Sequence, residues 1–315
     1  MRRSLRDYLL ISVKGMAMGA ADVVPGVSGG TIAFISGIYE ELINTISGVD
    51  ISLLRIWKEE GFSVMWKKLN GNFIIALLSG ILLSIFTVMR LANYLLEHHP
   101  VLIWAFFFGL VLASIYYVGK QIPKWSLNVF IFLLIGATTA FYLTTLPPLA
   151  AASSDLYLFM AGAIAICAMI LPGISGAFIL VLLGAYKTIS EATHEFDFKT
   201  LGIVALGAVF GLLSFSRLLK WLFLNYSTLT LATLTGFIAG SLNKIWPWKE
   251  VLETATYGEK SVVIREESVM PWNFAGEPHA MQAFFLMLAG FAVILILEGI
   301  AVKKPVHENG ENQDV

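Results

Sequence analysis

A helix-breaking motif occurs twice in this chain, each time within a long apolar stretch. The motif is Pro25-Gly26-Val27-Ser28-Gly29, and it returns 147 positions later as Pro172-Gly173-Ile174-Ser175-Gly176. Identities at the same spacing continue beyond the motif and pair Ile32 with Ile179, Gly37 with Gly184, and Tyr39 with Tyr186. A broken helix at membrane depth leaves backbone N–H and C=O groups where water is scarce. Broken helices at matching places in two halves of a chain indicate the binding site of a transporter.

The composition assigns the chain to the integral membrane proteins. Of its 315 residues, 57% are hydrophobic and 14% are charged, whereas a soluble domain carries about 25% charged residues. The long apolar runs favour membrane-spanning helices over the alternating ten-residue strands of a membrane barrel. A net charge of −1 gives no overall basic character that would suggest a nucleic-acid partner.

The apolar segments predict one all-α polytopic membrane domain over residues 1–315. A helical hairpin surrounds each breaker, with arms at 8–24 and 29–47 in the first and at 156–171 and 176–190 in the second. Six further spans are predicted at 72–95, 101–118, 127–146, 201–224, 228–244 and 281–302. The hairpin arms are shorter than the roughly 20 residues that a spanning helix needs, which favours re-entrant hairpins, although two tilted full spans also fit.

The two halves are predicted to be repeats of inverted topology, at about 8–146 and 155–302. Beyond the hairpins, the halves align Gly80 with Gly207, Arg90 with Arg217, Gly109 with Gly236, and Gly136 with Gly290. Each repeat therefore consists of a hairpin and three transmembrane helices. Because a hairpin returns to its own side and three spans end on the opposite side, the second copy must be inverted.

Lysine and arginine positions orient this arrangement with both termini in the cytoplasm. Arg2, Arg3 and Arg6 precede the first hairpin, and Lys303 and Lys304 follow the last span. Segment 49–70 carries basic residues among tryptophans and leucines, so we expect a cytoplasmic interfacial helix there. The long loop 245–280 then lies outside.

The breakers supply candidate phosphate-binding residues. Proline ends a helix, glycine permits unusual dihedral angles, and serine or threonine caps the next helix, whose unpaired N–H groups attract anions. The alternative is a structural kink that neighbouring helices satisfy. The candidates at the two breakers are Pro25, Gly26, Ser28, Gly29, Gly30, Thr31, Pro172, Gly173, Ser175 and Gly176.

Five charged positions extend this candidate site. Arg90 and Arg217 occupy matching places near helix ends, and their guanidinium forks suit phosphate, although snorkelling to the interface is the alternative. Asp22 lies within an apolar run, where an acidic residue indicates function, here ion coupling. A local structural pair with a cation such as Lys14 is the alternative. Glu40 and Glu41 are further coupling candidates, or are simply solvated.

The first breaker and the residues before it resemble the signature of a known family. The segment from Gly15 to Thr31, GMAMGAADVVPGVSGGT, is similar to that of the bacterial polyprenyl-phosphate transporter family PopT, and LPGISG at 171–176 resembles its second signature. The resemblance covers about 8–300. It implies an inverted-repeat fold with two re-entrant hairpins and a role in returning undecaprenyl phosphate from the outer to the inner leaflet of the cytoplasmic membrane, which recycles the carrier for peptidoglycan and other envelope polymers.

The sequence therefore predicts a lipid-phosphate flippase in the bacterial inner membrane, not an enzyme, whose partners are its substrate and membrane lipids. A proton or sodium gradient is the expected coupling partner, and no cofactor, metal or nucleic acid is expected. One alternative is an ion-coupled transporter of a small soluble anion. Another is a membrane enzyme acting on lipid phosphates, for which the sequence offers no recognisable nucleophile, zinc spacing or phosphate-binding loop.

Overall fold

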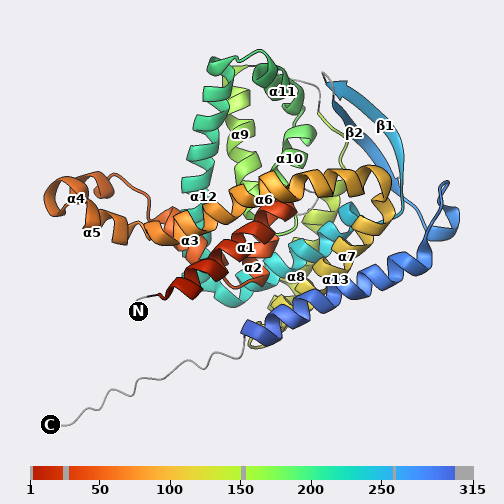
Figure 1. Ribbon diagram of the computed structural model, residues 1–315, viewed down its shortest axis with the longest axis horizontal. Coiled ribbons are helices and arrows are strands. Elements are labelled where there is room, and N and C mark those ends of the chain that lie inside the picture. The colour runs from red at the N-terminus through yellow and green to blue at the C-terminus, as the bar shows by residue number, and fades with distance from the viewer. Residues whose placement is uncertain (1–2, 24–27, 150–153, 258–259, 302–315) are drawn as a thin grey trace, which may run out of the picture.

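The protein is mostly helical in the computed structural model, which describes residues 3–23, 28–149, 154–257 and 260–301 (Figure 1). The first half contains α1 (Leu5–Val23), α2 (Gly29–Ile35), α3 (Tyr39–Ser47), α4 (Ser52–Glu60), α5 (Phe62–Lys68), α6 (Gly71–His98), α7 (Pro100–Lys120) and α8 (Leu127–Thr145). The second contains α9 (Asp155–Ile170), α10 (Gly176–Leu182), α11 (Tyr186–His194), α12 (Phe198–Ser241), η1 (Leu242–Ile245), β1 (Lys249–Tyr257), β2 (Lys260–Ser268), η2 (Pro271–Asn273) and α13 (Ala280–Ala301).

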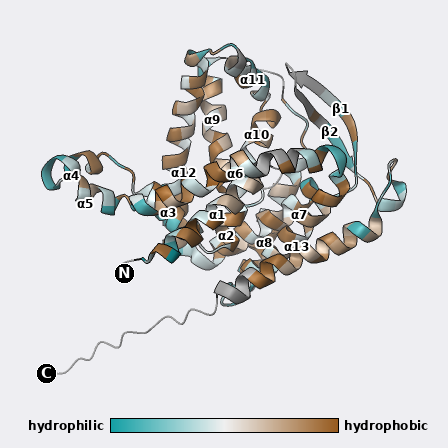
Figure 2. Cartoon of the chain, in the orientation of Figure 1, coloured by the Kyte–Doolittle hydropathy of each residue, from teal (hydrophilic) through white to brown (hydrophobic). Residues whose placement is uncertain are grey.

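The long helices correspond to the predicted spans. Three helices among the described residues are long and apolar enough to cross a membrane, namely α7, α8 and the segment from Phe198 to Ile245. These helices consist mostly of hydrophobic residues, coloured brown in Figure 2, and Leu206 and Phe210 on α12 are both more than half exposed. A soluble protein does not leave such extended apolar surfaces uncovered. These surfaces therefore face lipid, as the prediction of a helical membrane protein requires.

The second arm of each hairpin is two helices, so the prediction of single arms at 29–47 and 176–190 is wrong. The first arm breaks between α2 and α3 at Gly37, and the second breaks between α10 and α11 at Gly184. These glycines have φ values of 71° and 66°, in the left-handed region that a side chain disfavours. Gly37 and Gly184 occupy matching positions in the two halves of the sequence, so the extra break could have been predicted from it.

Helix α12 joins the two spans predicted at 201–224 and 228–244. It bends at Tyr226, whose φ of −138° and ψ of 42° lie outside the helical region. The two arms of α12 diverge from this bend, and they pack on different neighbours. The N-terminal arm lies against α9, because Gly207 of the arm approaches Phe159 of α9, and the C-terminal arm lies against α8, because Gly236 approaches Leu133.

Glycines that the repeat aligns make equivalent close contacts between helices. A methyl group on Gly80 would lie 1.9 Å from the carbonyl oxygen of Ser12, and one on Gly207 would lie 2.0 Å from that of Phe159. These contacts join α6 to α1 and α12 to α9. The aligned Gly136 and Gly290 likewise bring α8 against α12 and α13 against α7. Small residues allow membrane helices this close approach.

The two predicted loop regions both contain regular structure. Segment 49–70 forms α4 and α5, which project from the helical body on the left of Figure 1. Loop 245–280 contains an antiparallel hairpin of β1 and β2, a small sheet that the prediction of a helical membrane protein did not include. The strands are rich in valine, threonine and glutamate, a mixture of β-branched and polar residues that suits a sheet outside the membrane.

Candidate functional site

The two breakers, far apart in sequence, touch each other. The hydroxyl of Ser28 donates a hydrogen bond to the carbonyl of Met169 at 3.0 Å, and the backbone N–H of Gly173 donates to the hydroxyl of Thr31 at 2.8 Å. Ser28 and Thr31 are each only 1% exposed. These buried bonds satisfy backbone groups that the broken helices leave unpaired, which is the requirement for irregular backbone inside a membrane protein. We call the contact of residues 28–31 with residues 169–173 the tip junction.

Glycine makes the tip junction possible. A methyl group on Gly30 would lie 2.5 Å from the carbonyl oxygen of Ile170. Gly173 has a φ of 95° and lies against Phe237 and Ser241 of α12. Pro172 is buried beside it. The candidates Pro25 and Gly26 lie outside the described residues, so the structure places Gly29, Gly30 and the second breaker but not these two.

Charges from α1 occupy both ends of α2. A carboxylate oxygen of Asp22 accepts a hydrogen bond of 2.6 Å from the backbone N–H of Gly29, the first residue of α2. The ammonium group of Lys14 donates at 2.6 Å to the carbonyl of Ser36, which follows the last residue of α2. This arrangement complements the helix dipole, with the negative charge at the N-terminus and the positive charge at the C-terminus. The first breaker thus already holds an anion, its own Asp22.

The second breaker lacks this internal carboxylate. Met169 stands where the first repeat has Asp22. Ser28 caps α2 by accepting from the N–H of Gly30 at 3.0 Å, whereas the side chain of Ser175 makes no capping bond to α10. Ser175 and Gly176 are both partly accessible. Of the two matched motifs, the second one therefore starts its helix without a side-chain cap.

Arg217 lies apart from the tip junction and bonds to the first hairpin instead. Arg217, an exposed residue of α12, donates from Nη2 to the carbonyl of Val49 at 2.9 Å, just beyond the C-terminus of α3. This bond links α12 to the end of the first hairpin. Arg90 belongs to α6, but the position of its side chain lies outside what the structure describes.

The other acidic candidates also lie elsewhere. Both carboxylate oxygens of Glu41 accept from the guanidinium of Arg3, at 2.7 and 2.6 Å, and Glu41 also accepts from Asn70. Glu41 therefore fastens the start of the chain to the first hairpin. Glu40 is exposed in the first turn of α3. Of the three acidic candidates, Asp22 is the one at the tip junction.

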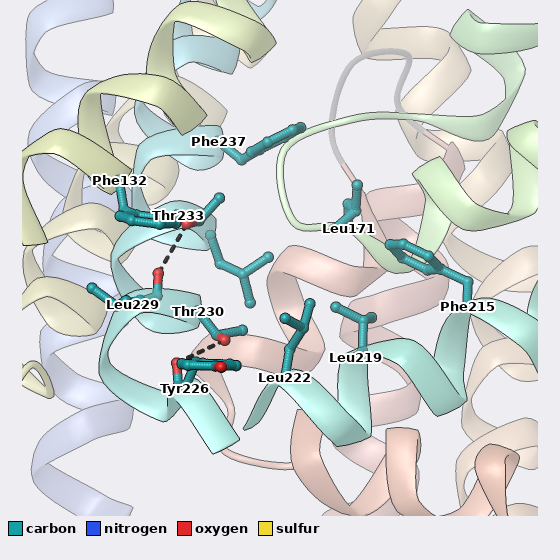
Figure 3. Close-up of a pocket in the computed structure, with 11 residues that line it drawn as sticks. Phe132, Leu171, Phe215, Leu219, Leu222, Tyr226, Leu229, Thr230, Thr233 and Phe237 are labelled. Carbon is teal, nitrogen blue, oxygen red and sulfur yellow. Dashed lines mark hydrogen bonds between the residues drawn. The ribbon is translucent and has the colours of Figure 1, made fainter. Parts of the chain in front are cut away.

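An apolar cavity of about 460 Å³ opens between the two arms of α12. Figure 3 shows Tyr226 at the bend and Leu171, the residue before the second breaker, at the opposite side. The remaining walls are Phe132, Phe215, Leu219, Leu222, Leu229, Thr230, Thr233, Leu234 and Phe237. The hydroxyls of Thr230 and Thr233 donate to carbonyls of their own helix, so they leave the cavity apolar in character.

This cavity was not foreseen from the sequence. The segments 201–224 and 228–244 were predicted as spans, but no local pattern shows which of their apolar faces enclose a space. The volume falls within the range of about 300–1,000 Å³ that is common for small-molecule sites. Among the described residues, no three His, Cys, Asp or Glu side chains gather as metal ligands would. The arrangement can thus receive an anion beside Ser175 and a hydrocarbon in the cavity.

Known proteins resemble this chain over most of its length. A family model described as undecaprenyl phosphate translocase-like matches residues 18–263. A polyprenyl-phosphate transporter of Vibrio cholerae is 46% identical over 303 residues, which cover 94% of this chain and 98% of the relative. A polyprenyl-phosphate transporter of Staphylococcus aureus is 32% identical over 253 residues, which cover 75% of this chain and 85% of that relative. No solved structure matches the chain.

Proposed function

Because this chain belongs to the undecaprenyl phosphate translocase-like family, we propose that it is a transporter and not an enzyme. Its substrate is undecaprenyl phosphate, which it moves from the outer to the inner leaflet of the bacterial cytoplasmic membrane. The relatives from Vibrio cholerae and Staphylococcus aureus are named for polyprenyl phosphate, which fits this substrate class. The transported lipid would then return to the inner leaflet as a carrier for envelope synthesis.

The observation that carries this proposal is the apolar cavity beside the second breaker. A lipid phosphate needs a polar place for its headgroup and an apolar place for its chain, next to each other. Leu171 lines the cavity, and four residues later Ser175 begins α10 with its hydroxyl uncommitted to a cap. We assign the lipid headgroup to Ser175 and Gly176, next to the tip junction. The first isoprene units of the lipid then lie in the cavity.

We further propose that the two halves are inverted repeats with re-entrant hairpins and that both termini are cytoplasmic. Figure 1 supports this orientation, because the N-terminus, α3 to α5 and the last turns of α13 lie at one side, while α11 and the β-hairpin lie at the other. The equivalent glycine contacts of the aligned helices support the repeat. In this arrangement the bend at Tyr226 is on the cytoplasmic side.

Arg90 and Arg217 serve the two faces of the membrane in this proposal. Arg90 lies toward the outside and helps to capture the phosphate, and Arg217 lies toward the cytoplasm and helps to release it. Arg217 donates one of its guanidinium N–H groups to Val49. A guanidinium has five donors in a fork that matches phosphate, so this bond is compatible with a phosphate contact.

Asp22 is the residue that we propose for coupling to an ion gradient. Its carboxylate holds the N–H of Gly29 at the start of α2, beside the tip junction. A proton on Asp22 would remove the negative charge from this helix start and would lower its repulsion toward an arriving phosphate. Glu40 and Glu41 lie away from the tips, and Glu41 is neutralised by Arg3, so the coupling role falls to Asp22.

A serine substitution tests the proposed headgroup position. We expect Ser175→Ala to raise the substrate concentration for half-maximal transport by about tenfold to a hundredfold, because a hydrogen bond to a charged group contributes about 1.5–3 kcal/mol. Transport of undecaprenyl phosphate in proteoliposomes gives the measurement. Ser126→Ala is the matched control, since Ser126 also precedes a helix without a capping bond. Equal values for the two variants would contradict the assignment.

A further inference from the structure

Two lysines meet one glutamate beneath the β-hairpin. The ammonium groups of Lys244 and Lys249 each lie 2.7 Å from the same carboxylate oxygen of Glu266. Lys249 has a side chain only 10% exposed, and those of Lys244 and Glu266 are 20% and 22% exposed. Lys249 also donates to the backbone carbonyl of Lys244. The cluster is therefore largely shielded from water, and its electrostatic interactions are strong.

The charges of this cluster do not balance. Two ammonium groups share one carboxylate, which leaves one excess positive charge in a largely buried place. Among the described residues of the hairpin, the other acidic side chains lie on the opposite face or pair elsewhere. Glu250 and Glu267 stand opposite each other in the strands and project to the other face of the sheet from Lys249, because side chains alternate along a strand. Glu253 lies near Arg265, with a closest approach of 3.9 Å, in an exposed pair.

The cluster adjoins the helix that starts at the second breaker. The ammonium nitrogen of Lys244 lies 4.8 Å from the ring centre of Phe178, and that of Lys249 lies 5.5 Å from the ring centre of Trp104 on α7. Phe178 comes three residues after Ser175, and positions three apart share one face of a helix. The excess positive charge thus contacts a side chain in the first turn of α10, the helix that Ser175 precedes.

We propose that Lys244 and Lys249 form an anion site at the outer end of the protein, which takes the phosphate monoester of the lipid before it passes to Ser175. The direction of passage rests on the proposed function, whereas the binding of a phosphate group does not. Each ammonium group has three N–H donors, of which Lys244 uses one on Glu266, so donors remain for a phosphate oxygen. The flanking rings of Phe178 and Trp104 give an apolar contact to the part of the isoprenoid chain next to the phosphate.

The ionisation of Lys249 agrees with this excess of positive charge. Burial lowers its pKa to about 8, an effect that the nearby Lys244 increases and Glu266 opposes. The charged and titratable groups that contact Lys249 among the described residues are these two, beside the ring of Trp104. A bound phosphate would stabilise the protonated form. We therefore expect phosphate binding to weaken as the pH rises from 7 to 9, because Lys249 loses its proton over that range.

Calorimetric titration of the purified full chain with inorganic phosphate tests this site without any transport step. We expect Lys244→Gln to weaken phosphate binding at least tenfold. Glu266→Gln removes the carboxylate that competes with phosphate, and we expect it to tighten binding several-fold. Arg265→Gln is the matched control, because it removes one positive charge from the exposed face of the same hairpin and should leave the affinity unchanged.

The two glutamine variants separate a binding site from a purely structural ion cluster. Lys244→Gln leaves one lysine for one glutamate, so the charge is balanced and we expect the protein to fold. Unchanged affinity in Lys244→Gln, or weaker binding in Glu266→Gln, would overturn the proposal. Competition between inorganic phosphate and undecaprenyl phosphate in nanodiscs would identify the lipid headgroup as the ligand, whereas binding without competition would identify free phosphate. Either result is independent of whether the protein transports the lipid.

Discussion

Replacement of Leu222 by tryptophan is expected to reduce transport of undecaprenyl phosphate by at least tenfold while the protein stays folded. Leu222 is a half-buried residue of α12 that points into the apolar cavity (Figure 3). An indole ring at this position occupies the space that we assign to the isoprenoid chain. Overpacking of a filled core usually costs about 1–3 kcal/mol, but here a cavity of about 460 Å³ receives the larger side chain.

The control for this experiment lies two positions away on the same helix. Leu224 is 76% exposed on the apolar surface, so Leu224→Trp adds the same ring outside the cavity. Initial transport rates in proteoliposomes and thermal unfolding in detergent are measured for both variants. If Leu222→Trp transports at the same rate as Leu224→Trp, the isoprenoid chain of the lipid does not occupy this cavity.

The second large effect is expected from a single methyl group at the tip junction. In Gly30→Ala, the added carbon would lie 2.5 Å from the carbonyl oxygen of Ile170 and 2.9 Å from that of Met169. Both neighbours are backbone atoms, so the two tips must move apart, and the bond from Ser28 to Met169 is lost or lengthened. We expect a lower unfolding temperature and a loss of most transport activity.

Gly202→Ala is the matched control for this change. Gly202 lies inside α12, and a methyl group there meets no neighbour within 4 Å. Alanine is favoured over glycine within a helix by about 0.8–1 kcal/mol, so this variant should be slightly more stable than the natural protein. Identical unfolding temperatures for Gly30→Ala and Gly202→Ala would refute a structural role for the tip junction.

The sequence predicted the broken segments and the long helices because their signals are local. Proline, glycine and serine mark a helix break wherever they occur together, and about 20 apolar residues mark a span. The duplicated motif also draws attention to Thr31 and Gly173, which a hydrogen bond joins in the structure. That contact itself joins residues 142 positions apart, and no single-sequence pattern encodes it.

Other features depend on packing that local patterns do not reveal. The sequence makes Asp22 a candidate for ion coupling, but its bond to Gly29 forms only when α1 and α2 fold against each other. The cavity requires the bend at Tyr226, and the lysine cluster requires the β-hairpin that folds over α7 and α10. The breaks at Gly37 and Gly184, in the second arm of each hairpin, do not depend on packing in this way. They could be predicted, because these two glycines align in the sequence.

Reconstitution of the purified protein in liposomes shows whether it moves a lipid phosphate across the bilayer. Proteoliposomes containing undecaprenyl phosphate are followed over time for the fraction of lipid phosphate exposed on the outer leaflet, with protein-free liposomes and the Leu222→Trp protein as references. Release of inorganic phosphate and uptake of soluble phosphate are recorded in the same samples. We expect faster redistribution of the lipid with the natural protein than with either reference, and neither phosphate release nor phosphate uptake. Redistribution no faster than in protein-free liposomes, with the protein folded and inserted, would rule out lipid-phosphate transport by this protein.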